Sequence, residues 1–333
     1  MKLFLRKITL FTLIGLIPII ISLIGYFHFD PFKVLKPYKD YSNSYIIPNR
    51  DYISTEIFLK NKNNCNSFIF GSSRTIAFRT SSWKKYLDTN SKPFLYDASS
   101  ESVYGIYKKI KYIDSLNINI NNVLIILCRD YSFENDANHK GHLFIKHPAI
   151  SGESELHFQL EFYKAYLNPK FIFCFYNYTF TKKYKNYMKG FVENNRIMFD
   201  TTTNEINEID QESQITKHPI EYYADRNDVF YFRKGERVDS VKRINKKQLF
   251  MLNEIKHILN KNKSKYKVVI SPLYEQVKLN PNDLNILQKV FGKNLYDYSG
   301  KNSFSELKTN FYEASHYRPD VGEKILFNIY RLK

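Results

Sequence analysis

The chain has 333 residues, of which 43% are hydrophobic and 17% aromatic, so it can build a substantial core and its composition excludes a disordered chain. Its formal net charge is +17. Two interpretations of this charge stay open: an anionic partner such as lipid headgroups or an acidic glycan, and a general over-use of Lys with Asn, Ile, Phe and Tyr, which we favour. No nucleic-acid recognition motif accompanies the charge, so we expect no nucleic-acid partner.

The N-terminus is predicted to be a membrane anchor over residues 1–29. Three basic residues precede an uncharged run from Ile8 to Phe27. Twenty helical residues at about 1.5 Å each span about 30 Å, the thickness of a hydrocarbon core. The run has no A-x-A cleavage site, which favours an uncleaved signal anchor over a cleaved signal peptide. A large domain after a single early span is usually translocated, so we expect residues 30–333 outside the membrane.

Beyond the anchor, residues 30–54 are rich in Pro, Tyr and Lys and are predicted to form a juxtamembrane linker. Residues 55–333 alternate short apolar strands with helices, which predicts an α/β domain with a parallel sheet covered on both faces. The expected strands are 67–70, 94–96, 123–128, 267–270 and 294–298, and the expected helices are 83–87, 103–116, 246–260, 284–291 and 321–331.

The alternation breaks between about residues 131 and 240, which we interpret as an insertion. It contains aromatic helical stretches at 158–166 and 171–178, and a polar, acidic loop at 200–213. We expect a mostly helical cap over one end of the sheet. The aromatic stretch 171–180 is expected to be core, with a sugar groove or a membrane surface as alternatives.

Polar residues follow the carboxyl ends of the predicted strands, where α/β sheets bind their ligands. Gly71-Ser72-Ser73-Arg74 follows the first strand, and Glu313 to His316 follows the last. A serine becomes a nucleophile when a base takes its proton and a third group orients that base. We therefore predict Ser73 as nucleophile, His316 as base and Glu313 as the orienting carboxylate. Backbone N–H groups of the helix beginning near Ser73 would hold an oxyanion.

These two blocks resemble the SGNH/GDSL hydrolases, which implies a three-layer, flavodoxin-like fold. Within that superfamily the chain is most similar to its membrane-anchored branch, which includes the teichoic acid D-alanyl-transfer protein and exopolysaccharide O-acetyltransferases. The resemblance implies Ser73 as nucleophile, with Ser72 as the alternative, and Gly105 as an oxyanion donor. The chain departs from the family in having Glu313 in place of Asp and no Asn after the third strand. Arg129 or Arg74 is the expected cationic substitute.

The resemblance implies a serine acyltransferase or acyl esterase that works through an acyl-enzyme on a cell-envelope polysaccharide. It also implies a bacterial cytoplasmic membrane location, a domain facing the periplasm or exterior, and a membrane-bound O-acyltransferase as partner. The alternatives are a non-catalytic scaffold or glycan-binding protein, and a lipid esterase. We expect no cofactor and no metal, because His139, His142 and His147 lack acidic or Cys partners at ligand spacing.

Overall fold

A five-stranded parallel sheet forms the centre of the protein, seen in a computed structural model that describes residues 1–193, 197–224, 226 and 228–331. The strands lie in the order β2-β1-β3-β7-β9. Counted along the chain, this order is 2-1-3-4-5, that of flavodoxin-type sheets. The predicted α/β class and parallel sheet are confirmed. The strands are β1 (Ser67–Gly71), β2 (Pro93–Asp97), β3 (Asn122–Leu127), β7 (Lys265–Ile270) and β9 (Leu295–Asp297).

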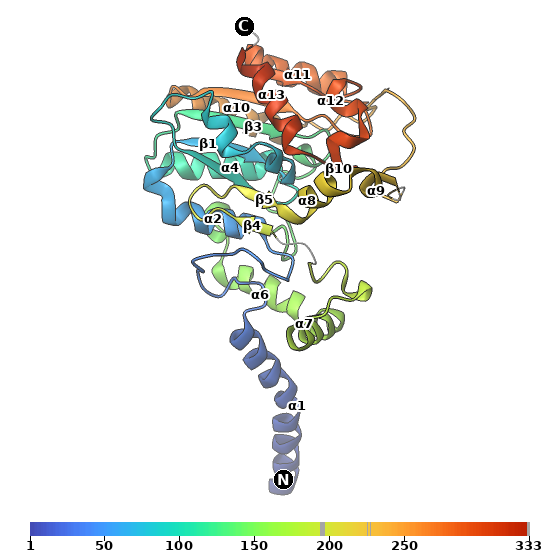
Figure 1. Ribbon diagram of the computed structural model, residues 1–333. Helices are drawn as coiled ribbons and strands as arrows, with labels where there is room; N and C mark the ends of the chain where they lie inside the picture. Colours follow the sequence, from blue (N-terminus) through green and yellow to red (C-terminus); the bar gives the residue numbers. More distant parts are fainter. Residues whose placement is uncertain (194–196, 225, 227, 332–333) are drawn as a thin grey trace.

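Helices cover both faces of this sheet (Figure 1). Because both faces are covered, β1, β2 and β3 are buried along their whole length, which explains their continuous apolar sequences. Phe58 of α2 stacks on Tyr96 of β2 on one face, while Trp83 of α3 donates a hydrogen bond to Tyr330 of α13 on the other. The first face carries α2 (Arg50–Asn61), α4 (Val103–Ser115), α10 (Lys246–Lys261) and α11 (Pro281–Phe291), and the second carries α3 (Thr80–Lys84) and α13 (Pro319–Arg331).

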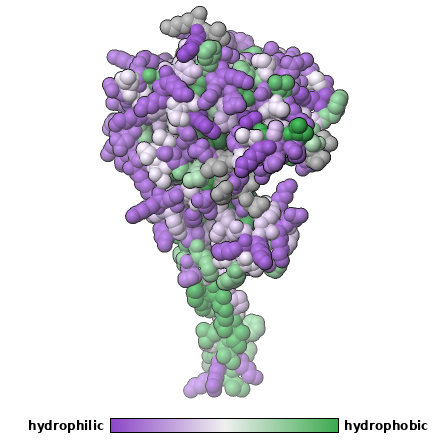
Figure 2. All heavy atoms as spheres, viewed as in Figure 1, coloured by the Kyte–Doolittle hydropathy of each residue, from purple (hydrophilic) through white to green (hydrophobic). Residues whose placement is uncertain are grey.

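The N-terminal helix α1 (Lys2–Phe29) projects away from the rest of the protein (Figure 1). Its 28 residues correspond to about 42 Å. Within the described residues it is the one helix long and apolar enough to cross a membrane. Figure 2 shows its hydrophobic surface below a largely hydrophilic head. The predicted apolar helix at the N-terminus is confirmed.

The segment predicted as a linker over 30–54 is packed into the protein instead. The carboxylate of Asp30 accepts hydrogen bonds from the backbone of Val34 and Leu35 and from the Tyr38 hydroxyl. Four apolar side chains between residues 32 and 46 are buried: Phe32, Val34, Tyr41 and Ile46. Helix α2 already begins at Arg50, capped by Asn49. The chain therefore leaves α1 without a flexible spacer.

The insertion at 131–240 divides into two parts. The first contains α5 (Pro148–Ser151), α6 (Glu155–Tyr166) and α7 (Pro169–Thr181). Helices α6 and α7 lie beside the end of α1 (Figure 1), whereas α5 packs against α4. The second contains β4 (Ile197–Phe199), β5 (Ile206–Glu208), α8 (Ile209–Lys217) and α9 (Pro219–Ala224). The expected loop at 200–213 is thus partly wrong, because it includes β5 and the first turn of α8. Near its end, β6 (Arg237–Val238) pairs with β8 (Val277–Lys278).

Helix α13 makes a close approach to the turn after β1. A Cβ added to Gly322 would lie 2.0 Å from the carbonyl oxygen of Ala77. No side chain fits at that distance from a backbone atom, so glycine sets the separation of the two segments.

We expect Gly322→Ala to lower the free energy of unfolding by about 1–3 kcal/mol, because α13 must shift away from Ala77. Chemical denaturation of the detergent-solubilised chain measures this change. Lys324→Ala, an exposed position on the same helix, is the control and should leave stability nearly unchanged. Equal stability of G322A and K324A would contradict the close-packing argument.

Candidate active site

The turn after β1 presents one serine and buries its neighbour. Gly71 has φ +153°, and a Cβ added there would lie 2.5 Å from the carbonyl oxygen of Ile126. The chain then enters a 3-10 helix, η2 (Ser73–Ala77). Ser72 is buried, with its hydroxyl 3.5 Å from the sulfur of Cys128, whereas Ser73 is half-buried. Ser73 is therefore the serine that solvent can reach.

A small hairpin carries the acid and the imidazole. Strand β10 (Phe311–Glu313) pairs antiparallel with β11 (His316–Tyr317), and Glu313 lies directly opposite His316. The cross-strand position brings the carboxylate to Nδ1 of His316, where the two form a hydrogen bond. The Ser315 amide donates to the other carboxylate oxygen at 2.7 Å. The i, i+3 spacing is thus that of a tight β-hairpin, where a loop before the helix was expected.

The hairpin places His316 against the turn after β1. The hydroxyl oxygen of Ser73 lies 2.7 Å from Nε2 of His316, although the residues are 243 positions apart. With its proton on Nδ1, the imidazole donates to Glu313 and accepts the Ser73 hydroxyl hydrogen. The structure thus brings together Ser73, His316 and Glu313 in the arrangement of a serine nucleophile, base and orienting acid.

The charge state of Glu313 suits this arrangement. Burial alone would raise the pKa of its carboxyl, but the hydrogen bonds from His316 and the Ser315 amide, with the charge of Arg74, lower it below the ordinary value. The group is therefore a carboxylate at neutral pH. Its favourable interaction is fully present above the ordinary glutamate pKa and is lost as the pH falls through the lowered pKa.

Arg74 holds the two halves of the site together. Its Nε donates to the carbonyl of Ser315 at 2.8 Å, and its guanidinium pairs with Asp130 at 3.0 Å. The side chain is only 5% exposed. Burial would lower the pKa of Arg74, but Asp130 and Cys128 beside it raise that pKa, so the group stays charged. These contacts show that Arg74 is a clamp that holds the hairpin in place. The sequence had suggested Arg74 or Arg129 as a cationic substitute for the missing oxyanion-hole Asn.

The second part of the insertion supports the same hairpin from the other side. Glu212 of α8 forms an ion pair with Arg318 at 2.7 Å and accepts the Tyr312 hydroxyl at 2.6 Å. Tyr223 of α9 donates to the carbonyl of Phe311 at 2.9 Å. These contacts could not be predicted from the sequence, because no pattern in residues 200–224 indicates that they pack against residues 311–318.

Two other predicted site residues have structural partners. Arg129 pairs with Asp239 at 2.6 Å and with Glu275. It thus ties the end of the insertion to the loop after β7. Gly105 lies in the first turn of α4, where an added Cβ would be 2.0 Å from Oε1 of Glu101 and 2.8 Å from Cε of Lys146. The structure brings Gly105 to these side chains, and the described contacts of Gly105 include neither Ser73 nor His316.

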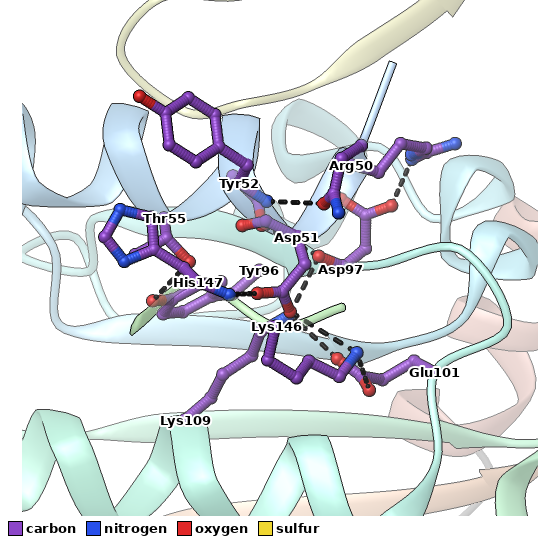
Figure 3. Close-up of polar contacts among 12 residues, drawn as sticks. Arg50, Asp51, Tyr52, Thr55, Tyr96, Asp97, Glu101, Lys109, Lys146 and His147 are labelled. Atoms are coloured by element: carbon purple, nitrogen blue, oxygen red, sulfur yellow. Dashed lines mark hydrogen bonds and ion pairs between the residues drawn. The ribbon is translucent and has the colours of Figure 1, made fainter. Parts of the chain in front are cut away.

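Glu101 and Lys146, next to Gly105, belong to a buried cluster of alternating charges. Figure 3 shows this cluster. Lys109 lies 3.0 Å from Asp51 and 2.8 Å from Glu101, and Lys146 lies 3.4 Å from Asp51 and 2.6 Å from Glu101. All four side chains are at most 1% exposed. Burial would raise the pKa of Asp51, but the two lysines lower it overall. We call these four residues the charge quartet. The two negative charges and the two positive charges of the quartet sum to zero.

The three histidines of the insertion occupy separate environments. His139 lies 3.0 Å from the Ser102 hydroxyl, and His147 lies 3.2 Å from Glu56. His142 packs against Phe32. Burial lowers the pKa of His139 to about 4, so this side chain is neutral at physiological pH. Among the described residues, no three His, Cys, Asp or Glu side chains group as metal ligands.

We expect Arg74→Ala to lower the free energy of unfolding by about 1–3 kcal/mol, because it removes the bond to Ser315 and leaves Asp130 without its cation. Denaturation of single and double variants with Asp130→Ala measures the coupling between them. Lys84→Ala, at an exposed position on α3, is the control. Additive effects of R74A and D130A would contradict the clamp.

A scan against models of known protein families finds no match, and a search of curated proteins finds no significant match. The functional interpretation of the site therefore rests on its geometry and on the residues themselves.

Proposed function

We propose that the protein is a membrane-anchored, SGNH-like serine acyltransferase or acyl esterase acting on a cell-envelope polysaccharide. The observation that carries this proposal is the 2.7 Å contact between the Ser73 hydroxyl and Nε2 of His316, with Glu313 on the opposite nitrogen. A hydroxyl, imidazole and carboxylate in this order form an activated nucleophile. Their position at the carboxyl edge of a parallel sheet agrees with where such sheets bind ligands.

The chemistry proceeds in two balanced steps. The Ser73 oxygen attacks the carbonyl carbon of an acyl ester while its proton passes to Nε2 of His316. The carbon–oxygen bond to the leaving group then breaks, and His316 returns the proton to that group, leaving an acyl-enzyme. In the second step a glycan hydroxyl, or water, gives its proton to His316 as its oxygen attacks the acyl carbon. The bond from that carbon to the Ser73 oxygen then breaks, and His316 returns the proton to Ser73. Glu313 stabilises the imidazolium in both steps.

The oxyanion donors of this mechanism come from the backbone. The first N–H groups of a 3-10 helix have no acceptor within that helix, and η2 begins at Ser73. The amides of Ser73 and Arg74 are thus the nearest candidates. The side chains of Arg74 and Arg129 are engaged with Asp130, Asp239 and Glu275, so we do not assign them to the oxyanion.

The surroundings of the triad favour a large acceptor. The His316 side chain is 37% exposed and Glu313 26%, so the site opens to the surface. An open site suits a polymer better than a small molecule, which is usually enclosed. The preference for transfer over hydrolysis, the outward orientation at a bacterial inner membrane, and a membrane-bound O-acyltransferase as acyl-donor partner follow from the resemblance. They are parts of the same proposal.

A fluorophosphonate probe tests the nucleophile, because it forms a covalent bond with an activated serine. We expect labelling of the full chain in detergent and its complete loss in Ser73→Ala. Ser72→Ala, which removes the neighbouring buried hydroxyl, is the matched control and should still be labelled. Absence of labelling in a folded wild-type chain would favour the alternative, a non-catalytic envelope scaffold or glycan-binding protein.

Glu313→Gln tests the orienting acid. It preserves the size of the side chain but removes the charge that stabilises the imidazolium. We expect the turnover of a short acyl ester to fall about 10²–10⁴-fold with little change in KM. Glu306→Gln, at an exposed position, should leave turnover unchanged. Retention of full activity in E313Q would remove Glu313 from the mechanism.

A further inference from the structure

Helices α6 and α7 and the turn between them expose apolar side chains next to the end of α1. The exposed fractions are 45% for Leu160, 43% for Leu167, 59% for Phe173 and 74% for Phe180. We call these four residues the apolar rim. On α7, Phe173 and Phe180 share one helix face with the half-buried Tyr176, while Phe171 and Phe175 face the core. Between residues 171 and 180 the sequence has no charged residue.

Contacts with α1 fix the height of these helices. The Ser22 hydroxyl lies 2.6 Å from that of Tyr163 on α6. A Cβ added to Gly25 would lie 2.6 Å from the hydroxyl oxygens of both Tyr166 and Tyr176. Phe29 packs edge-on against Tyr176 of α7. Figure 1 shows α6 and α7 at the base of the head, beside the end of α1.

The positions of these contacts along α1 indicate how deep α6 and α7 would lie in a membrane. The apolar run of α1 ends at Phe27, and Ser22 lies five residues earlier, about 8 Å along the helix. If α1 crosses a membrane with this run in the hydrocarbon, the Tyr163 hydroxyl lies about 8 Å below the boundary between hydrocarbon and headgroups. Amphipathic helices at membrane surfaces bury their apolar face by about 5–10 Å, which matches this depth.

The charges around α7 suit the same location. Residues 169–192 contain five lysines and no acidic residue. The lysines are Lys170, Lys182, Lys183, Lys185 and Lys189, all exposed. On α6, Glu161 is neutralised by Lys164 at 2.8 Å. Basic side chains beside an apolar face are typical of contact with anionic lipid headgroups.

We propose that α6 and α7 form a second membrane contact, in which the apolar rim lies in the lipid interface beside α1. The partner is the lipid surface itself. Together with α1, this contact would fix the tilt of the head and the height of the turn after β1 above the membrane. The inference does not depend on the proposed reaction.

Tryptophan variants of the full chain test this contact in vesicles of phosphatidylethanolamine and phosphatidylglycerol containing nitroxide-labelled lipid. The native Trp83 is fully buried and gives a constant background. Phe173→Trp and Phe180→Trp should be quenched at least about twofold more than Phe250→Trp. Phe250, on α10, is 58% exposed against 59% for Phe173, and α10 lies on the far side of the head from α1 (Figure 1).

Two results would overturn the proposal. Quenching of F173W and F180W no stronger than that of F250W would mean that lipid does not reach the rim, and a protein partner would then be required to cover it. Stronger quenching by a nitroxide at the chain end than by one near the headgroup would place the rim too deep for an interfacial contact. Thermal melting identifies any variant that does not fold, and F180W, at the most exposed position, decides the test if F173W fails.

Discussion

The contact between Ser73 and His316 joins the two ends of the sheet domain. One residue follows the first strand and the other lies in the hairpin before the last helix, so their hydrogen bond requires the whole domain to be folded. An increase of about 1 Å in the 2.7 Å separation of the two groups would break this hydrogen bond. The surrounding structure can therefore be understood as a set of contacts that keep the hairpin in place.

These contacts reach the hairpin from three directions. Arg74, at the sheet edge, donates to the Ser315 carbonyl, and Glu212 of the insertion pairs with Arg318. Directly after β7, the hydroxyl of Ser271 lies 3.1 Å from the hydroxyl of Tyr317. Each is a hydrogen bond or ion pair of modest energy. Acting on one short segment, residues 315–318, they restrict its motion more than any of them would alone. The insertion is thus part of the support for the site.

The sequence was most informative for strands that are buried on both faces of the sheet. Strands such as β3 are apolar throughout because helices cover both faces, and the pattern is readable without knowing the partners. Ser73, His316 and Glu313 could be proposed because strand order brings carboxyl ends to one edge. The nucleophile assignment itself remains a prediction.

Helix α2 could not be predicted in the same way, because its buried face includes Asp51, Ser54 and Thr55. Polar residues at core positions break the apolar period, and their partners are distant in sequence. Asp51 pairs with the lysines of the charge quartet, Ser54 donates to the Asp97 carbonyl, and Thr55 accepts a hydrogen bond from the Tyr96 hydroxyl. The packing around Gly105 could not be predicted either, since it depends on how the side chains of Glu101 and Lys146 fold against this glycine. The packing of residues 30–49 was missed because aromatic residues between prolines have no helical or strand period.

The charge quartet also determines how the protein can come apart. Asp51 belongs to α2, Lys109 to α4 and Lys146 to the insertion, so separating the membrane-proximal layer from the sheet would leave unpaired ions in a dry interior. Breaking a buried ion pair costs several kcal/mol, because it leaves each charge without its partner in an environment that water does not reach. Partial detachment of the base of the head is therefore disfavoured, and the quartet couples the segment next to α1 to the helices that cover the sheet.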